Sequence, residues 1–201
     1  MRITAEAKTA TRQRILEVAE ELFRTKGFEA TTTRDIAQEA EIATGTLFNY
    51  FATKEAIVTE LAAESLDRAR GEFGKQADET ETLEEGLFAL SAVELRQLRP
   101  FRKYIVPMLE TAFCPLAAAE RNAPGEELRR QHLETVAGLA CRHGLGELSA
   151  VALQLYWTLY TGVLAFWAAD KSPKQEDTLA LLDESLAMFV AWLHTGADDK
   201  K

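Results

Sequence analysis

Residues 32–54 read TTRDIAQEAEIATGTLFNYFATK, and this stretch predicts two short helices joined by a tight turn. Thr32 and Asp35 have the spacing of a capping box, in which each side chain binds the other residue's backbone amide at a helix start. The break at residues 41–43 is too short to form a structure of its own. The second helix, predicted over 44–51, must therefore cross the first at a steep angle, which is helix-turn-helix geometry. The first helix has a buried stripe of Ile36, Ala37 and Ala40.

The outer face of the second helix carries no charge, although a helix that only faces water would show charges there. Leu47 and Phe51 are kept for the core. Hydroxyls, an amide, aromatic rings and a bare glycine backbone suit base edges, thymine methyls and phosphates. From these residues alone two interpretations stay open: a surface that reads DNA, and a short amphipathic helix that only covers a core. The face consists of Thr44, Gly45, Thr46, Phe48, Asn49 and Tyr50.

A dense set of residues in the first quarter of the chain resembles the N-terminal domain of the tetracycline-repressor (TetR) family. The remainder is similar to that family only in length and helical layout. The resemblance implies a DNA-binding transcriptional repressor whose C-terminal domain binds a small molecule. The matching residues are Phe23, Lys26-Gly27-Phe28, Thr31-Thr32, Arg34-Asp35-Ile36-Ala37, Gly45-Thr46-Leu47, Tyr50-Phe51 and Thr53-Lys54-Glu55.

We predict that DNA contacts come from the start of the first short helix, from the second short helix and from the helix that follows. Thr46 and Asn49 are expected to read bases, whereas Tyr50 and Lys54 are expected to hold phosphates. The predicted DNA-binding residues are Thr32, Thr33, Thr44, Gly45, Thr46, Phe48, Asn49, Tyr50 and Lys54.

Three residues in this region depart from the family's usual pattern. Glu41 stands where the turn commonly has glycine, Ala43 where the second helix commonly has a Ser or Thr cap, and Phe48 where a Tyr hydroxyl commonly meets a phosphate. These differences put the affinity for DNA in question, and not the fold.

The net charge of −9 is unevenly distributed along the chain. Residues 1–55 hold eight Lys and Arg against nine Asp and Glu, so most of the acidic excess lies further on. An acidic body discourages non-specific association with DNA. The cations best placed for phosphates are Arg2, Lys8, Arg12, Arg14, Arg34 and Lys54.

The hydrophobic periodicity predicts an all-α protein of about nine helices. We expect a three-helix helix-turn-helix domain over residues 1–53 and a larger ligand-binding and dimerisation domain over 54–201, linked by a long helix from Thr53. The N-terminal helix, which precedes the helix-turn-helix, is predicted to begin near Thr9 or Thr11. Pro107 is expected to kink a helix over 101–113, and Ser172, Pro173 and Gln175 have the pattern of a cap for the last helix.

The chain is expected to be soluble and cytoplasmic. No stretch has the roughly 18 uninterrupted apolar residues of a membrane span, and the N-terminus lacks the apolar segment of a signal peptide. The spacing of Cys114, Cys141 and the three histidines predicts no metal site, no disulfide and no cofactor.

The two last helices carry more apolar surface than one subunit can bury. Residues 149–169 are apolar nearly all round, and the final helix has a second apolar stripe. A homodimer with a four-helix contact satisfies both helices, while an exceptionally buried helix pair in a monomer is the alternative. The predicted dimerisation residues are Tyr156, Tyr160, Val163, Trp167, Leu181, Ser185, Met188 and Trp192.

A small-molecule effector is predicted to bind among the helices of the larger domain. The candidate residues mix aromatic bulk with a few polar groups, which favours an apolar or aromatic, neutral ligand. Each of them is also compatible with an ordinary core position. They are Tyr104, Met108, Phe113, His132, Trp157 and Thr161.

Two other classes of function compete with a repressor. An enzyme is disfavoured because the sequence has no nucleophile elbow, phosphate loop or metal-ligand spacing, so no catalytic residue is predicted. A dimeric ligand-binding module that no longer reads DNA is the closer rival. Salt-sensitive, sequence-specific DNA binding distinguishes the repressor from both.

Overall fold

The computed structural model describes residues 4–75, 82–105 and 123–198, and these residues form eight α-helices, two 3₁₀ helices and no strand. The all-helical prediction is confirmed. The larger part of the helix predicted over 101–113, with Pro107, lies outside the described residues, and the part that is described is a 3₁₀ helix, η2 (Arg99–Tyr104). The chain divides into two compact units, residues 1–64 and 65–201. The boundary that we predicted after residue 53 stays a prediction.

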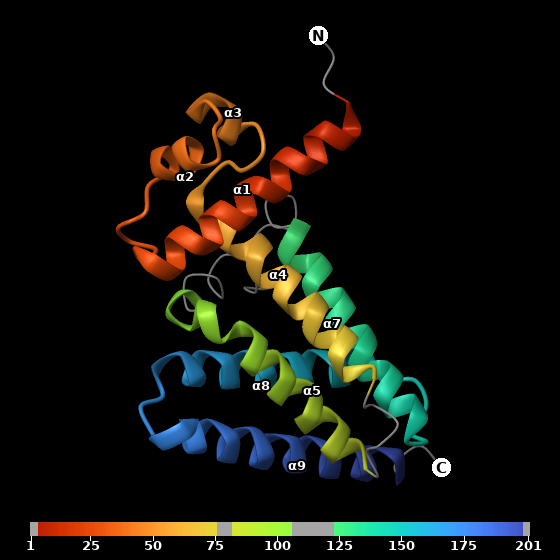
Figure 1. Ribbon diagram of the computed structural model, residues 1–201. Coiled ribbons are helices and arrows are strands. Elements are labelled where there is room, and N and C mark those ends of the chain that lie inside the picture. Colours follow the sequence, from red (N-terminus) through yellow and green to blue (C-terminus); the bar gives the residue numbers. More distant parts are fainter. Residues whose placement is uncertain (1–3, 76–81, 106–122, 199–201) are drawn as a thin grey trace. The chain divides into compact units, whose positions relative to one another are not determined.

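Unit 1 contains α1 (Ala5–Thr25), α2 (Thr33–Glu39), α3 (Thr44–Phe48) and the first part of α4 (Lys54–Phe73), as Figure 1 shows in red to orange. α2 packs against both α1 and α3. Each helix contributes a fully buried apolar side chain to one core, so the predicted helix-turn-helix is held by the helices on either side of it. These side chains are Ile15, Ile36, Leu47 and Ile57.

Two helix boundaries in unit 1 differ from the sequence predictions. α1 begins at Ala5, earlier than predicted, because the hydroxyl of Thr4 accepts a hydrogen bond from the Ala7 amide at 3.2 Å and caps the helix. α3 ends at Phe48, before the predicted residue 51, and Asn49 is its C-cap. The Asn49 amide bonds to the Thr46 carbonyl at 3.1 Å, which is the tighter spacing of a 3₁₀ turn.

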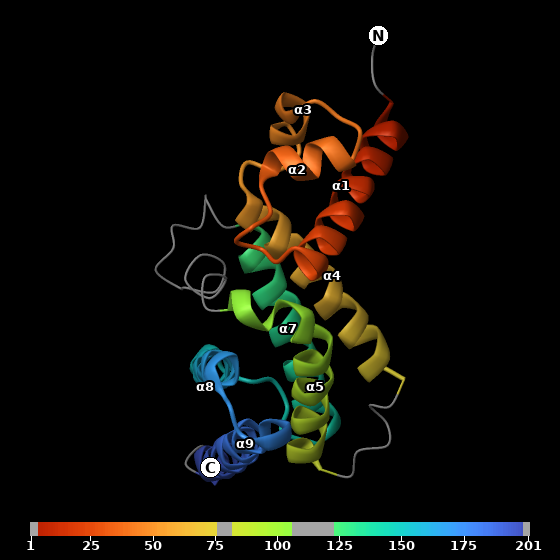
Figure 2. The ribbon, with the colours of Figure 1, turned by 60° about the vertical axis from the view of Figure 1, so that its left-hand side comes forward.

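Unit 2 contains α5 (Leu83–Leu98), α7 (Ala123–Arg142), α8 (Ala150–Ala169) and α9 (Glu176–Asp198), together with η2 and η5 (Pro173–Gln175). α8 and α9 form an antiparallel pair joined by a short turn, and α5 packs on α9 (Figures 1 and 2). A capping box between Thr82 and Glu85 starts α5, as predicted.

The cap of α9 differs from the prediction. Ser172 precedes Pro173 at the start of η5 as expected, but its hydroxyl accepts from the Asp177 amide, and the Gln175 side chain accepts from the Trp167 indole at 2.9 Å. The carboxylate of Asp170 binds the Thr178 amide and hydroxyl instead. Asp170, which lies eight residues before Thr178, therefore binds the first turn of α9.

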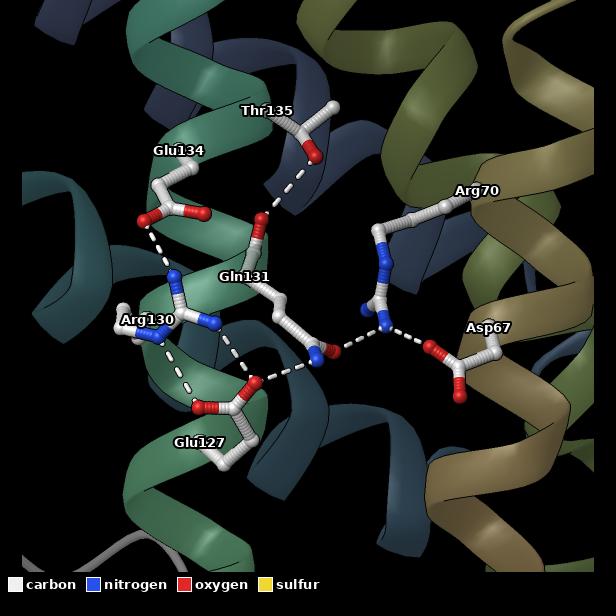
Figure 3. Close-up of polar contacts among 7 residues, drawn as sticks. All are labelled: Asp67, Arg70, Glu127, Arg130, Gln131, Glu134 and Thr135. Carbon is white, nitrogen blue, oxygen red and sulfur yellow. Dashed lines mark hydrogen bonds and ion pairs between the residues drawn. The ribbon is translucent and has the colours of Figure 1, made fainter.

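A polar ladder joins the last turns of α4 to α7 within unit 2 (Figure 3). Arg70 on α4 binds Asp67 one turn earlier and donates to the Gln131 amide oxygen on α7 at 2.5 Å. Gln131 in turn donates to Glu127 at 2.6 Å, and Glu127 also pairs with Arg130. The two helices are thus connected by charged and amide groups on this face.

α8 is long and apolar enough to cross a membrane by length and composition alone, a test that core helices of soluble proteins also pass. The dimerisation face predicted on this helix stays a prediction, but its side chains are already buried within the single subunit. Its four predicted residues are at most 4% exposed, since α8 packs against α7, α9 and η2. Ser185 on α9 is buried as well. The residues concerned are Tyr156, Tyr160, Val163, Trp167 and Ser185.

Candidate nucleic-acid interface and effector domain

The capping box that begins α2 forms as the sequence predicts. The Asp35 amide donates to the Thr32 hydroxyl at 3.1 Å, and the Thr32 amide donates to the Asp35 carboxylate at 2.9 Å. Lys26 also binds that carboxylate at 2.6 Å. The Lys26 ammonium, together with the Thr32 amide and hydroxyl, lowers the pKa of Asp35 to about 2. The start of α2 is therefore fixed to the end of α1.

The turn between α2 and α3 contains a strained residue. Glu41 has φ of +54°, in the left-handed region that a non-glycine side chain enters only at a cost of about 1–2 kcal/mol. Its neighbour Ala43 occupies the N-cap of α3 and provides no side-chain hydrogen bond. Two of the three departures from the family pattern thus have a structural consequence: the turn is strained and the second helix is uncapped.

The predicted DNA-reading face is accessible. Thr32, Gly45, Phe48 and Asn49 are exposed, and Phe48 shows 49% of its surface. Leu47 and Phe51 are buried, as predicted. The remaining predicted residues of this face are half-buried: Thr33, Thr44, Thr46, Tyr50 and Lys54.

Lys54 is more tightly held than expected for a phosphate ligand. Its ammonium donates to the carbonyls of Phe28 at 2.6 Å and Thr31 at 3.0 Å and lies 3.9 Å from the centre of the Phe28 ring. These contacts occupy two of its three donors and join α4 to the α1–α2 connection. Lys54 therefore braces the helix-turn-helix, and its predicted phosphate contact stays a prediction.

Arg12 also serves a structural contact within unit 1. It pairs with Glu60 on α4 at 2.9 Å, and its guanidinium lies 4.6 Å from the centre of the Phe51 ring. The sequence predicts Arg12 among the cations that meet phosphates. Its pairing was not predictable because Glu60 lies 48 residues away, with no local pattern that joins them.

Unit 2 contains a buried polar cluster, formed by Glu94, His132, Tyr156 and Tyr160. His132 Nδ1 lies 2.8 Å from one carboxylate oxygen of Glu94, and the Tyr160 hydroxyl donates to the other at 2.7 Å. The Tyr156 hydroxyl lies 3.2 Å from His132 Nε2. Burial, followed by the charge of Glu94, raises the pKa of both tyrosines, so both remain protonated donors. From the sequence, His132 is predicted as an effector residue and Tyr156 and Tyr160 as dimerisation residues, whereas no sequence signal distinguishes the buried acid on α5.

The predicted effector residues are only partly brought together. His132 and Trp157 are 1% exposed and their ring centres lie 5.8 Å apart. Thr161 bonds back to the Trp157 carbonyl at 2.9 Å, and Tyr104 is half-buried in η2. Met108 and Phe113 lie outside the described residues. The prediction of an effector site at these six residues therefore stays a prediction.

A cavity of about 540 Å³ lies elsewhere in unit 2, between the end of α5, η2 and the α8–α9 turn. Among the described residues its lining is strongly basic, and the four predicted effector residues that the structure describes, Tyr104, His132, Trp157 and Thr161, do not line it. The cationic side chains around it are Arg96, Arg99, Arg102, Lys171 and Lys174.

Known proteins resemble this chain in sequence and in structure. Residues 15–61 match the model of the bacterial regulatory proteins of the tetR family. The transcriptional repressor KstR2 of Mycolicibacterium smegmatis is 37% identical over 98 residues, which are 46% of this chain and 48% of KstR2. KstR2 of Rhodococcus jostii is 39% identical over 66 residues, 33% of this chain and 32% of that protein. The alignments thus span a third to about half of these relatives' length.

A solved structure extends the similarity to both units. Thermus thermophilus FadR, a TetR family transcriptional repressor in complex with lauroyl-CoA, superposes with a TM-score of 0.72 at 25% identity, covering 89% of this chain and 93% of FadR. The matched region in unit 1 contains α2, its capping box, the strained turn and α3. Residues 15–61 are thus a domain of the tetR family of bacterial regulatory proteins, and the fold is similar to that of a TetR family transcriptional repressor over 89% of the chain.

Proposed function

We propose that this protein is a cytoplasmic transcriptional repressor that binds an inverted-repeat operator as a homodimer and is released by a small-molecule effector held in unit 2. The observation that carries the proposal is the exposed, uncharged face of α3 inside the region that matches the tetR family. The related KstR2 proteins are repressors, which supports a regulatory role and not an enzymatic one.

The proposed DNA contacts follow from the chemistry of that face. The hydroxyls of Thr44 and Thr46 and the amide of Asn49 can bond to base edges, and exposed Phe48 can contact a thymine methyl or a sugar. In the rest of unit 1, Arg12, Arg24 and Lys26 are paired with acids, whereas Lys8, Arg14 and Arg34 are exposed cations that can meet phosphates. Base contacts from α3 should therefore add specificity to these phosphate contacts.

The proposed dimer uses the side chains that α8 and α9 leave exposed. Leu181, Met188 and Trp192 are 37%, 65% and 42% exposed and recur at i, i+7 and i+11, which places them on one face of α9. Val151 and Phe166 on α8 are 68% and 43% exposed. Apolar side chains in a repeating pattern on neighbouring helices are typical of a subunit interface. A two-fold dimer would place two α3 helices in successive major grooves, about 34 to 36 Å apart.

α4 connects the proposed DNA-binding unit, unit 1, to the proposed effector-binding unit, unit 2. It is one continuous helix that belongs to unit 1 up to Glu64 and to unit 2 from Ser65. In unit 2 the Arg70–Gln131 bond attaches its last turns to α7. An effector that binds unit 2 can change operator affinity only if it favours one of two α4 positions over the other.

The structurally similar FadR of Thermus thermophilus was solved in complex with lauroyl-CoA, which suggests an acyl thioester as one class of effector for this chain. Such a ligand has a long apolar chain and a phosphorylated head, and so it differs from the neutral ligand that the sequence favoured. We keep both classes as candidates for the effector and assign neither to the six predicted residues.

Selection of bound sequences from a random duplex pool tests the proposal. Purified protein at near-physiological salt should enrich an inverted repeat whose half-sites are about one helical turn apart. Enrichment of a single half-site would contradict the dimeric arrangement. A folded dimer that enriches nothing would favour the rival function, a ligand-binding module that no longer reads DNA.

A further inference from the structure

The basic cavity in unit 2 has the size and the charge of a binding site for an anionic small molecule. Its volume of about 540 Å³ lies within the roughly 300–1,000 Å³ of ligand pockets. Among the residues that the structure describes, five cationic residues and one acid, Asp170, line it, although the chain as a whole carries −9. A concave wall of one charge sign concentrates counter-charged ligands by focusing the field.

Asp170, the one acid among the described lining residues, is already bound by donors of its own chain. The carboxylate oxygens of Asp170 accept bonds from the Ser172 amide at 2.7 Å and from the Thr178 amide and hydroxyl at 3.1 Å and 2.5 Å. These donors satisfy the carboxylate at the start of α9, and Asp170 is only 8% exposed. Its charge therefore opposes an incoming anion less than an open carboxylate would.

Two of the cations that line the cavity bind other groups of the protein, and three can bind a ligand. Arg102 donates to the backbone carbonyls of Trp167 and Asp170 at the end of α8, and Arg96 pairs with Glu72. Arg99, Lys171 and Lys174 are exposed and have no hydrogen-bond or ion-pair partner among residues 4–75, 82–105 and 123–198. Within this described part of the chain, the charged groups of these three residues are thus available to bind an anion.

The turn that carries Lys174 has a strained backbone, which contacts with its neighbours hold in place. Lys174 and Gln175 have φ of +55° and +62°, two successive non-glycine residues in the left-handed region. Such strain persists only where surrounding contacts fix the conformation. Here the Trp167 indole holds the Gln175 side chain at 2.9 Å, and the ring of Trp167 lies 5.7 Å from the Arg102 guanidinium.

The cavity also has an apolar part, because Ala92, Leu95, Trp167 and Leu179 share its lining with the cations. A purely inorganic ion would leave this part unused. We propose that the basic cavity binds a phosphorylated small molecule, with Arg99, Lys171 and Lys174 on its phosphate groups and an attached organic group against the apolar wall. Binding at this site is independent of operator recognition; a regulatory effect of the ligand would rest on the proposed function.

Isothermal titration of the full-length, DNA-free protein tests the site directly. The probes are inorganic phosphate, adenosine 3′,5′-bisphosphate, coenzyme A and lauroyl-CoA. We expect the bisphosphate and coenzyme A to bind, more weakly as salt is raised, and inorganic phosphate to bind far more weakly than either. If the natural ligand is a free nucleotide, the bisphosphate and lauroyl-CoA should bind with equal affinity. If it is an acyl thioester, lauroyl-CoA should bind more tightly than the bisphosphate.

The double variant Arg99→Gln, Lys174→Asn should reduce the affinity for the bisphosphate by about tenfold or more. Asparagine is chosen at residue 174 because it tolerates the left-handed region. Lys103→Gln is the matched control, since Lys103 is an exposed cation of the same 3₁₀ helix that does not line the cavity. Circular dichroism establishes that each variant is folded.

Three outcomes would overturn the inference. The first is that neither the bisphosphate nor coenzyme A binds, even if lauroyl-CoA does. The second is equal affinity of the double variant and the parent. The third is an equal loss in the Lys103→Gln control. Because no DNA is present, none of these results depends on whether the protein reads an operator.

Discussion

Glu94 on α5 and His132 on α7 form a completely buried acid–base pair, with 2.8 Å between the carboxylate and Nδ1. The two residues are 38 positions apart, and two tyrosines of α8 complete their hydrogen bonding. Burying such a pair is costly unless each polar atom has a partner. The cluster therefore fixes one arrangement of the three helices that contribute to it.

Removing one hydroxyl from this cluster should destabilise unit 2. Tyr160→Phe leaves a carboxylate oxygen of Glu94 without its donor, and we expect a loss of about 1–3 kcal/mol in the free energy of unfolding. Tyr156→Phe removes a longer bond to an imidazole nitrogen and should cost less, about 0.5–1.5 kcal/mol. Urea unfolding followed by circular dichroism measures both. Equal losses in the two variants would mean that the hydrogen bond to the Glu94 carboxylate contributes no more to stability than the bond to His132.

The strain at Glu41 predicts a stabilising substitution. Glu41→Gly should raise the free energy of unfolding by up to about 1 kcal/mol, because glycine adopts positive φ without a clash but loses more backbone entropy on folding. Glu39→Gly, at the last residue of α2, should instead lower stability by about 0.5–1 kcal/mol. Thermal unfolding of the two variants checks the sign. If Glu41→Gly also destabilised the protein, the turn would not be strained.

The register of the recognition helix can be tested at Asn49. Asn49→Ala should weaken binding to the selected operator by about 1–3 kcal/mol, because a base-edge amide contact is lost. The dependence of affinity on salt should stay nearly unchanged, since no phosphate contact is removed. Fluorescence anisotropy over a salt series measures both quantities. Parent-like affinity would show that Asn49 does not read a base.

The exposed stripe of α9 predicts the oligomeric state. Met188→Glu places a charge at a residue that is 65% exposed in the single subunit, and it should dissociate the proposed dimer because a buried charge in an apolar interface lacks a partner. Phe48→Gln, which alters an exposed apolar side chain of unit 1, is the control and should leave the dimer intact. Sedimentation equilibrium distinguishes the two. A Met188→Glu dimer as tight as the parent would exclude this face.

The acid cap of α9 predicts a pH dependence. Hydrogen bonds from Thr178 and Ser172 lower the pKa of Asp170 from 3.8 to about 2, so its stabilisation is complete above the unfolded value and is lost as the pH falls through about 2. Asp170→Asn should therefore lower the melting temperature at pH 7, and its difference from the parent should shrink between pH 4 and 2. Asp183→Asn, at an exposed residue of α9, serves as the control. A difference that does not change with pH would contradict the ionic cap.

The local elements were predictable because their signals lie within a few residues of one another. The capping boxes at Thr32 and Thr82 form as their spacing requires, and Gly27 adopts positive φ after α1. The boundaries of α1 and α3 were less well predicted, since single hydrogen bonds at Thr4 and Asn49 decide them. Hydrophobic periodicity and capping residues predict the presence of a helix more reliably than they predict where it ends.

By itself, the sequence determined that this protein is all-helical, that a helix-turn-helix occupies its first quarter, and that its last two helices are unusually apolar. These properties depend on periodicity and on residues close together in the chain. Only the tertiary structure decided which side chains of α8 are buried, that Lys54 and Arg12 brace unit 1, and that five cations of the described residues line one cavity. The physical reason is that burial and charge pairing depend on which distant helices pack together, and no local pattern encodes that partner.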